Sequence, residues 1–328
     1  MAKPKVAFAG TGWIGRNRLQ AIVDTAAAEV IAIADPSHEM RSAAQLVAPG
    51  AECYDSFDAL LGGKYDAVVI ATPSAMHAEQ AIAVLKSGAA VFCQKPLGRT
   101  AAETAEVVET ARATDKLLAV DFSYRHVRAM QAVYACVRAG DIGEVYAAEL
   151  VFHNAYGPDK AWFYDPAQSG GGCVIDLGIH MADLALWVMD SPEIVRCASH
   201  LMAKAKQWDP QANGVEDYAV AQLTTATGAV INLACSWNLP AGCDAVIKAA
   251  FYGTKGAAAF TNIDGSFFNF AAYRHEGTHR QVLYDGPDEW FGRAGAEFAR
   301  SLAQDSSFNA AAEEVTAAAR VIDMIYNR

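Results

Sequence analysis

The sequence lacks the features that mark several large classes of protein. It has no uninterrupted run of about 18 apolar residues, the length that a membrane span needs. It has no basic stripe for nucleic-acid phosphates, and its formal net charge is −11. It also has no linker rich in Pro, Gly or Ser and no internal repeat. We therefore expect a soluble globular protein that binds neither membranes nor nucleic acid.

The sequence also lacks the cysteine spacing that indicates disulfide bonds. The seven cysteines include no Cys-x-x-Cys pair and are scattered through apolar segments, as is typical of reduced core thiols. The first residues do not have the form of a secretory signal, because their apolar stretch is short and broken by glycines. These absences favour a cytoplasmic location.

The sequence has ample material for two domains, with 328 residues of which 53% are hydrophobic. Up to about residue 122, short Val/Ile/Ala runs alternate with helical patterns, as in "KVAFAG", "EVIAIAD", "DAVVIAT" and "AAVFCQ". Strands buried on both faces have this composition in parallel sheets covered by helices. We predict an α/β doubly wound Rossmann domain over residues 1–122.

The remaining residues, 123–328, have a different pattern. Segments such as "VEDYAVAQLTTATGAVINLACSWN" alternate apolar and polar residues around short turns, which indicates antiparallel or mixed strands of one large open sheet. A helix is predicted over residues 173–190, and two more helices close the chain. We predict an α+β domain, with the C-terminal helix a candidate for packing back on the first domain.

The turn after the first strand, "GTGWIG", has the Gly-x-Gly-x-x-Gly order. Gly10 permits the tight turn, Gly12 lets the backbone approach a pyrophosphate, and Gly15 allows close helix packing. The intervening Trp13 and Ile14 place amide groups at the helix start, where anions bind. Asp35 follows at the spacing expected for the acid that binds the adenosine ribose, so NAD is favoured over NADP. Arg41 lies close enough in sequence to keep NADP as an alternative.

A lysine follows the strand at residues 90–93. In open α/β sheets ligands bind beyond the carboxyl ends of the strands, so the position of Lys95 in "VFCQKPLG" points it toward a nicotinamide. Pro96 makes a cis peptide bond possible, and the sequence does not decide it.

The segment "GGGCVIDLGIHMAD" puts three polar residues on one face of an apolar helix. Asp176 and His180 are four residues apart, and Asp183 follows three later. The glycines at 170–172 would let the backbone come close to a ligand. The alternative is a structural hydrogen-bond pair, which would be the better interpretation if Lys95 were absent.

Taken together, these motifs resemble the glucose-fructose oxidoreductase/inositol dehydrogenase (Gfo/Idh/MocA) family over essentially the whole chain. They are "GTGWIG", "ATPSAMH", "QKP", the pair Tyr124-Arg125, and "GGG…DLGIH". The resemblance implies pyridine-nucleotide redox chemistry on a secondary alcohol of a sugar, polyol or inositol. It also implies that the domain of residues 123–328 binds the substrate and that its sheet forms a homodimer or homotetramer.

The resemblance further implies that Lys95, Asp176 and His180 form the catalytic group. His180 is suited to accept the hydroxyl proton, while Lys95 as an ammonium would stabilise the alkoxide or exchange the proton itself. The cofactor-binding residues would then also include Thr72, Pro73, Ser74, His77, Gln94 and Lys95. Candidate substrate-binding residues, besides the catalytic three, are Tyr124, Arg125, His153, Tyr156 and Trp162.

One position departs from the family pattern. The usual motif is Glu-Lys-Pro, and this chain has Gln94 before Lys95. A neutral amide replaces a carboxylate, so the lysine loses one nearby negative charge.

A second motif, "HEGTH" at residues 275–279, has the order used by zinc proteases. Those proteins carry both histidines on a helix, whereas this segment has strand composition on both sides and Gly277 at its centre. We predict a hairpin tip and no metal. The alternatives to a dehydrogenase are a nucleotide-binding regulatory protein, a redox-neutral enzyme with retained NAD, and a metal-dependent hydrolase or lyase.

Overall fold

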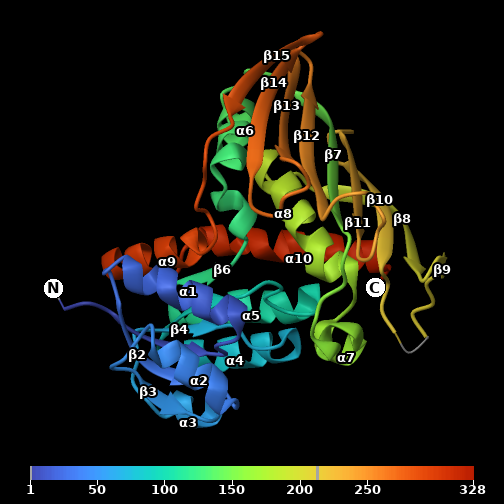
Figure 1. The fold of residues 1–328 in the computed structure, drawn as a ribbon. Coiled ribbons are helices and arrows are strands. Elements are labelled where there is room, and N and C mark those ends of the chain that lie inside the picture. The colour runs from blue at the N-terminus through green and yellow to red at the C-terminus, as the bar shows by residue number, and fades with distance from the viewer. Residues whose placement is uncertain (1, 212–213) are drawn as a thin grey trace. The chain divides into compact units, whose positions relative to one another are not determined.

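The computed structural model describes residues 2–211 and 214–328, which fold as two compact units. The first unit contains residues 1–123 and 291–316, and the second contains residues 124–290 and 317–328. The chain thus returns to the first unit after completing most of the second. Figure 1 colours the returning segment, which includes α9, red.

The first unit is built on a parallel six-stranded sheet with the order β3-β2-β1-β4-β5-β6. The strands are β1 (Lys5–Ala9), β2 (Glu29–Ala34), β3 (Glu52–Tyr54), β4 (Ala67–Ile70), β5 (Ala90–Cys93) and β6 (Leu118–Val120). The order reverses between β1 and β4, which is the switch point where doubly wound sheets bind ligands. The Rossmann prediction is confirmed.

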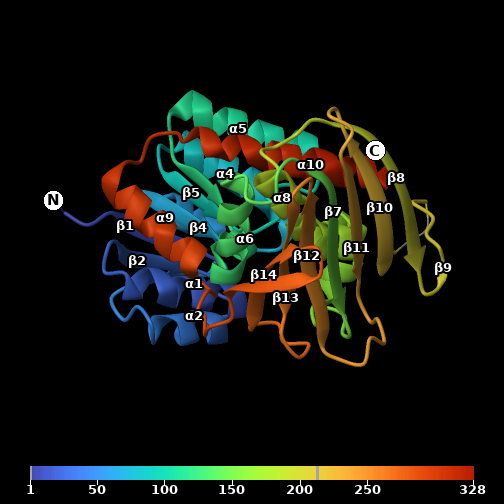
Figure 2. The same ribbon diagram turned by 90° about the horizontal axis from the view of Figure 1, so that it is seen from above.

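Helices cover both faces of this sheet. They are α1 (Trp13–Asp24), α2 (His38–Gln45), α3 (Phe57–Leu61), α4 (Ser74–Lys86), α5 (Ala101–Thr114) and α9 (Arg293–Gln304), with a short 3₁₀ turn at Ala310–Ala312. Right-handed crossovers that run in opposite directions from the switch point place α1 and α4 on opposite faces. Figure 2 shows α1 beside α9 and α4 beside α5, and both pairs are in contact.

The core of the first unit explains why the distant segment belongs to it. Phe298 and Leu302 of α9 are buried in the same cluster as Phe8, Leu19 and Ile22. The rings of Phe298 and Phe92 lie 5.3 Å apart. Helix α9 therefore completes the apolar layer that α1 begins.

The second unit is built on a nine-stranded mixed sheet with the order β15-β14-β13-β12-β7-β11-β10-β8-β9. Its strands are β7 (Val145–Asn154), β8 (Ile194–Ala203), β9 (Lys206–Gln207), β10 (Tyr218–Thr225), β11 (Val230–Ser236), β12 (Ala245–Gly253), β13 (Gly256–Asn262), β14 (Phe270–Glu276) and β15 (His279–Tyr284). Only the pairing of β11 with β7 is parallel. The prediction of one large, mainly antiparallel or mixed sheet is confirmed.

The helices of this unit are α6 (Arg128–Arg138), α7 (Pro166–Ser169), a π-helical segment at Val174–Gly178, α8 (Ile179–Val188) and α10 (Glu313–Tyr326), which begins in the first unit. Short 3₁₀ turns lie at Ser123–His126 and Ala161–Tyr164. Helices α6 and α8 pack on the sheet, where Leu150, Phe152 and Leu233 are buried. The helical stretch at Pro166–Val188 is long and apolar enough to cross a membrane by composition, but 89% of its apolar window is buried, as in the core helix of a soluble protein.

The "HEGTH" segment is the tip of a hairpin, as predicted. Strands β14 and β15 pair Glu276 with His279, and Gly277 has a φ of +55° in the turn. Neighbouring residues on a strand point to opposite faces, so His275 and Glu276 diverge. In the described ranges, no group of three or more His, Cys, Asp and Glu side chains is placed to hold a metal ion.

Candidate functional site

The glycine-rich loop of the first unit has the geometry of a dinucleotide-binding turn. Gly10 has a φ of +86°, and a Cβ there would lie 2.5 Å from the Ala71 carbonyl oxygen. A Cβ on Gly15 would lie 2.3 Å from the Gly10 carbonyl oxygen. Both glycines are therefore required by the fold itself, as the sequence predicts for the tight turn and the close helix packing.

Gly12 differs from these two glycines because, apart from its own neighbours in the chain, no atom of the described protein lies within 4 Å of where its Cβ would be. Gly12 also caps α1 without any side-chain hydrogen bond to the first turn. The amide groups at the start of α1, from Trp13 onward, are thus placed to bind an anion, with open space in front of them. These residues fit a nucleotide pyrophosphate.

Asp35 directly follows β2, and its carboxylate faces the same loop. One carboxylate oxygen accepts from the Thr11 amide at 2.8 Å, and the other accepts from the Ser37 amide at 2.9 Å. The Thr11 hydroxyl adds a third hydrogen bond at 3.2 Å. A carboxylate has about four acceptor positions, so Asp35 retains capacity for a ribose hydroxyl. Arg41 donates to the Asp35 carbonyl oxygen at 2.5 Å, which places a guanidinium beside the same residue.

His77 joins the turns that follow β4 and β5. Its Nε2 lies 2.7 Å from the Thr72 carbonyl oxygen and its Nδ1 lies 2.6 Å from that of Pro96. The side chain is buried, and burial lowers the pKa of His77, with the Lys95 charge acting in the same direction. A neutral ring can donate only one of these two bonds. His77 therefore donates to one of the two carbonyl oxygens and lies beside the other, between the two turns. Its direct contact with a cofactor stays a prediction.

The rest of the "ATPSAMH" motif lies at the β4 end and the start of α4. Pro73 caps the helix with its backbone, and the buried Ser74 is the first helical residue. The Thr72 hydroxyl donates to the Gln80 side-chain oxygen at 2.7 Å. The motif thus lies at the carboxyl end of β4, at the switch point of the sheet, beside β1 and its glycine-rich loop.

Lys95 follows β5, and its peptide bond to Pro96 is cis. The preceding residue is anchored on both its backbone and its side chain: the Gln94 amide donates to the Ile70 carbonyl oxygen at 2.9 Å, and its side-chain Nε2 donates to Asp121 at 2.5 Å. Lys95 is half-buried, as is Gln94. The lysine is therefore carried on a turn that the sheet edge holds in place.

In the second unit, the predicted helix is confirmed, but its first turn is π-helical. Asp176 lies in the π-helical segment Val174–Gly178, and His180 lies in the first turn of α8. Single π-turns within α-helices are frequent at functional sites. Asp176 accepts a hydrogen bond from the Trp237 indole at 3.1 Å.

His180 is buried in an aromatic surround. The Tyr124 ring meets it edge-on at 5.0 Å, and the Phe152 ring lies 6.5 Å away. Burial raises the pKa of the Tyr124 hydroxyl, and the negative charge of Asp176 raises it further. Tyr124 therefore stays neutral, packs against the His180 ring and lies near enough to Asp176 to feel its charge.

The glycines before this helix lie against other parts of the protein. The sequence led us to expect a ligand close to their backbone, but protein atoms occupy that space. A Cβ on Gly171 would lie 2.0 Å from the Tyr326 hydroxyl, and one on Gly172 would lie 1.9 Å from the Glu216 carbonyl oxygen. The fully buried Glu216 carboxylate accepts from the amides of Gly172 at 3.0 Å and Val174 at 2.9 Å. It also accepts from the Tyr326 hydroxyl at 2.7 Å.

The other predicted substrate residues have protein partners. Arg125 forms a forked ion pair with the buried Asp183, with the closest atoms 2.6 Å apart. His153 Nδ1 lies 2.8 Å from the Ser236 hydroxyl oxygen, and burial lowers the pKa of this imidazole. The exposed Tyr156 donates to Asp244 at 2.6 Å, which raises the pKa of its hydroxyl. Trp162 stacks on Phe163 at 3.8 Å.

Four residues that the sequence analysis missed complete these networks: Arg18, Asp121, Glu216 and Trp237. Three of the four had a signal in the sequence. Asp121 follows the end of a parallel strand, and Trp237 follows the end of β11. Arg18 recurs at helical spacing with the buried Gly15, Leu19 and Ile22, so it occupies the inner face of α1.

Comparison with known proteins places the chain among the oxidoreductases. Residues 4–122 match the model of an oxidoreductase family with an NAD-binding Rossmann fold, and residues 130–259 match the GFO/IDH/MocA C-terminal domain. The chain is 29% identical to the D-glucoside 3-dehydrogenase of Escherichia coli K12 over 70% of this chain and 69% of that protein. It is 28% identical to the inositol 2-dehydrogenase 3 of Saccharopolyspora erythraea over 73% and 68%.

Solved structures share the fold over nearly the full length. Levoglucosan dehydrogenase in complex with NADH has a TM-score of 0.84 at 19% identity and covers 99% of this chain and 96% of its own. The aldose-aldose oxidoreductase from Caulobacter crescentus, complexed with glycerol, has a TM-score of 0.83 at 20% identity and covers 99% and 97%. With the glycine-rich loop, the Lys95 turn and the Asp176–His180 segment in place, the chain belongs to the Gfo/Idh/MocA family of oxidoreductases.

Proposed function

We propose that the protein is an NAD-dependent dehydrogenase that transfers a hydride between nicotinamide and a secondary alcohol of a sugar, polyol or inositol-like substrate. The observation that carries the assignment of a dinucleotide cofactor is the open space at Gly12, beside Asp35. This space lies in front of the first turn of α1, which no side chain caps. Similarity to sugar and inositol dehydrogenases supports the substrate class. When bound, the nicotinamide supplies the hydride acceptor or donor.

The side chains of this protein would manage the proton and the charge on oxygen. Loss of a hydride from an alcohol develops alkoxide character, and a base within hydrogen-bond reach must take the hydroxyl proton. We assign that role to His180, with Asp176 orienting the substrate hydroxyl or the ring, and Trp237 holding Asp176. Lys95 as an ammonium would stabilise the negative charge on oxygen, and it is the alternative proton acceptor.

NAD is favoured over NADP because the Asp35 carboxylate stands where the adenosine ribose binds in this fold, and its charge repels a 2′-phosphate. Arg41 supplies a nearby positive charge that would attract a 2′-phosphate, so the preference for NAD requires the Asp35 charge to outweigh it. We expect kcat/KM with NAD⁺ to exceed that with NADP⁺, and Asp35→Ser to reduce this preference. A wild-type preference for NADP⁺ would contradict the assignment.

Turnover on a panel of aldoses, polyols and inositols tests the reaction itself. Lys95→Met and His180→Asn should each lower kcat by about 10²-fold or more, the usual contribution of an acid–base group. Nucleotide affinity should stay within a few-fold. A redox-neutral enzyme that retains its NAD would instead convert substrate without net NADH formation, and product analysis in the absence of added nucleotide identifies that outcome.

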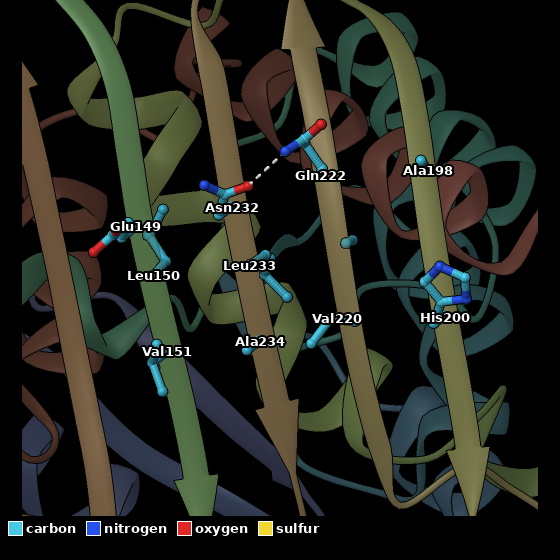
Figure 3. Close-up of a pocket in the computed structure, with 11 residues that line it drawn as sticks. Glu149, Leu150, Val151, Ala198, His200, Val220, Gln222, Asn232, Leu233 and Ala234 are labelled. Carbon is cyan, nitrogen blue, oxygen red and sulfur yellow. Dashed lines mark hydrogen bonds between the residues drawn. The ribbon is translucent and has the colours of Figure 1, made fainter. Parts of the chain in front are cut away.

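We also propose that the protein is a cytoplasmic homo-oligomer formed through the outer face of the large sheet. Four adjacent strands, β7, β11, β10 and β8, line a shallow pocket there, and Figure 3 shows small apolar side chains such as Val151, Val220 and Ala234 with Gln222 and Asn232 beside them. Seven free thiols suit a reducing compartment.

The oligomer prediction has a matched pair of variants. Val220→Arg places a charge in the pocket and should shift the mass measured by light scattering to that of a smaller species. Val282→Arg, on the edge strand β15, where the side chain is 49% exposed, should leave the mass unchanged. A monomeric wild type would contradict the proposal.

A further inference from the structure

A fully buried ion pair lies beneath the Lys95 turn. The Arg18 Nε atom lies 2.5 Å from Asp121 Oδ2, and the side chains are 2% and 0% exposed. Burying two charges costs several kcal/mol of desolvation each, so such a pair adds little to stability compared with apolar residues of the same size. The pair therefore needs a reason other than stability.

The ion pair is joined to the Lys95 turn through Gln94. The Gln94 Nε2 atom donates to the same Asp121 oxygen at 2.5 Å. The Asp121 amide in turn donates to the Cys93 carbonyl oxygen at 2.9 Å, so the two strand ends are tied by backbone and side chain. An amide is the side chain that this position requires, because a carboxylate at residue 94 would face a second carboxylate at hydrogen-bond distance.

The other end of the network reaches the nucleotide loop. Arg18 lies on α1, three residues after Gly15, and its guanidinium lies 4.4 Å from the centre of the Phe291 ring. Asp121 thus connects the helix that begins at the glycine-rich loop with the turn that carries Lys95. A displacement of this carboxylate would be felt by both segments.

We propose that Asp121 is a positioning residue for Lys95: it fixes the Gln94–Lys95 turn through the Gln94 amide, and it supplies the negative charge that a Glu-Lys-Pro motif places at residue 94. The inference rests on the proposed function of Lys95. It explains the departure at residue 94 as a relocated carboxylate. The network keeps one carboxylate, at residue 121 in place of residue 94, and Gln94 donates a hydrogen bond to it.

Two isosteric substitutions test the relocation. Asp121→Asn removes the carboxylate, and Asp121→Asn with Gln94→Glu returns one carboxylate and one amide with their positions exchanged. The first readout is the rate at which trace acetic anhydride acetylates Lys95 in the nucleotide-free protein. Mass spectrometry measures it relative to the exposed Lys64 and Lys86. Only the neutral amine reacts, and a nearby carboxylate favours the ammonium.

We expect Asp121→Asn to raise the relative labelling rate of Lys95 at least about threefold, because the carboxylate is lost and Arg18 is left as an uncompensated like charge. The exchanged variant should return the rate to the wild-type value or below. In turnover, Asp121→Asn should lower kcat at least about tenfold with KM for the nucleotide within about twofold, and the exchanged variant should recover to within about threefold of wild type.

A purely structural ion pair predicts otherwise. If the ion pair were purely structural, kcat and the labelling of Lys95 would change only in proportion to the loss of folded protein. The exchanged variant would then restore neither. The proposal is overturned if Asp121→Asn folds and leaves Lys95 labelling unchanged, or if the exchanged variant is no better than the single one. It is also overturned if the exchanged variant fails to fold, since the carboxylate would then be needed at residue 121 itself. Because labelling needs no turnover, a wild type inactive on every sugar would sink the proposed function and still leave this inference tested.

Discussion

The two units of the protein each hold a functional segment with a buried carboxylate, but they compensate its charge differently. In the first unit, Asp121 faces the guanidinium of Arg18, and one oxygen takes both the Arg18 and the Gln94 hydrogen bonds. In the second unit, Glu216 accepts from neutral groups, namely two backbone amides and the Tyr326 hydroxyl.

The difference shows in the energetics of the two acids. Burial raises the pKa of Glu216, and the hydrogen bonds from Val174, Tyr326 and Gly172 offset only part of that effect. Several neutral dipoles can therefore hold a segment in place while the charge remains costly. A guanidinium places an opposite charge beside its acid, but the network then depends on a single cation. We expect the Arg18–Asp121 network to lose much of its stability when the cation is removed. We expect the Glu216 network to lose stability gradually as pH rises.

The largest effect should come from removing the charged partner. Arg18→Met keeps most of the side-chain volume but leaves Asp121 buried without its cation, and we expect the free energy of unfolding to fall by about 3–5 kcal/mol. Urea denaturation measures it. Arg112→Met is the matched control, since its ion pair with Glu313 is exposed and should contribute at most about 1 kcal/mol. Equal losses in the two variants would remove the distinction between the two arrangements.

The next effect separates fold from binding within the glycine-rich loop. Gly15→Ala forces a Cβ to within 2.3 Å of the Gly10 carbonyl oxygen, so we expect about 1–3 kcal/mol of destabilisation. Gly12→Ala meets no atom of the described protein and should unfold at the wild-type urea concentration. Its NADH affinity should fall at least about tenfold, because the methyl group takes the place of the pyrophosphate. Unchanged affinity in Gly12→Ala would contradict the assigned loop.

A smaller effect should show the cost of the Glu216 charge. A carboxyl whose pKa is raised on folding keeps its proton longer in the folded state, so it favours folding at low pH and opposes it increasingly as pH rises past about 4.5. Glu216→Gln removes this dependence. Between pH 4 and pH 7, the free energy of unfolding of the variant should therefore rise relative to that of wild type. A pH-independent difference would show that Glu216 carries no such cost.

The smallest effect concerns Asp176. Trp237→Phe removes the indole N–H that lies 3.1 Å from its carboxylate, a bond worth about 1–2 kcal/mol. We expect kcat to fall about five- to tenfold with unchanged nucleotide affinity. Trp208→Phe, whose indole donates to the Gly214 carbonyl oxygen at 3.3 Å, is the control and should not change kcat. An equal change in both variants would assign Trp237 a general packing role.

Local patterns predicted the elements well. The Val/Ile runs and the helical spacing of Leu19 and Ile22 indicated the doubly wound sheet. The strand composition on both sides of Gly277 indicated the hairpin. Strand β3 and helix α3 could not be predicted from the sequence, because three to five residues give too little periodicity to detect.

The partners that hold the site could not be predicted in the same way. Asp121 and Arg18 are 103 residues apart, and Glu216 and Tyr326 are 110 apart, so their pairing is a property of the packed core. Gly171 and Gly172 were interpreted as making room for a ligand, but they make room for Tyr326 and Glu216. A glycine pattern shows that something comes close, and only the fold shows what it is.

The most direct test of the account is a fluorescence titration of the nucleotide-free protein with NADH and NADPH, for wild type, Asp35→Ala and Lys95→Met. The account predicts tighter binding of NADH than NADPH by wild type, loss of NADH affinity in Asp35→Ala, and retained affinity in Lys95→Met. Folded wild-type protein that binds neither nucleotide would contradict the dehydrogenase assignment.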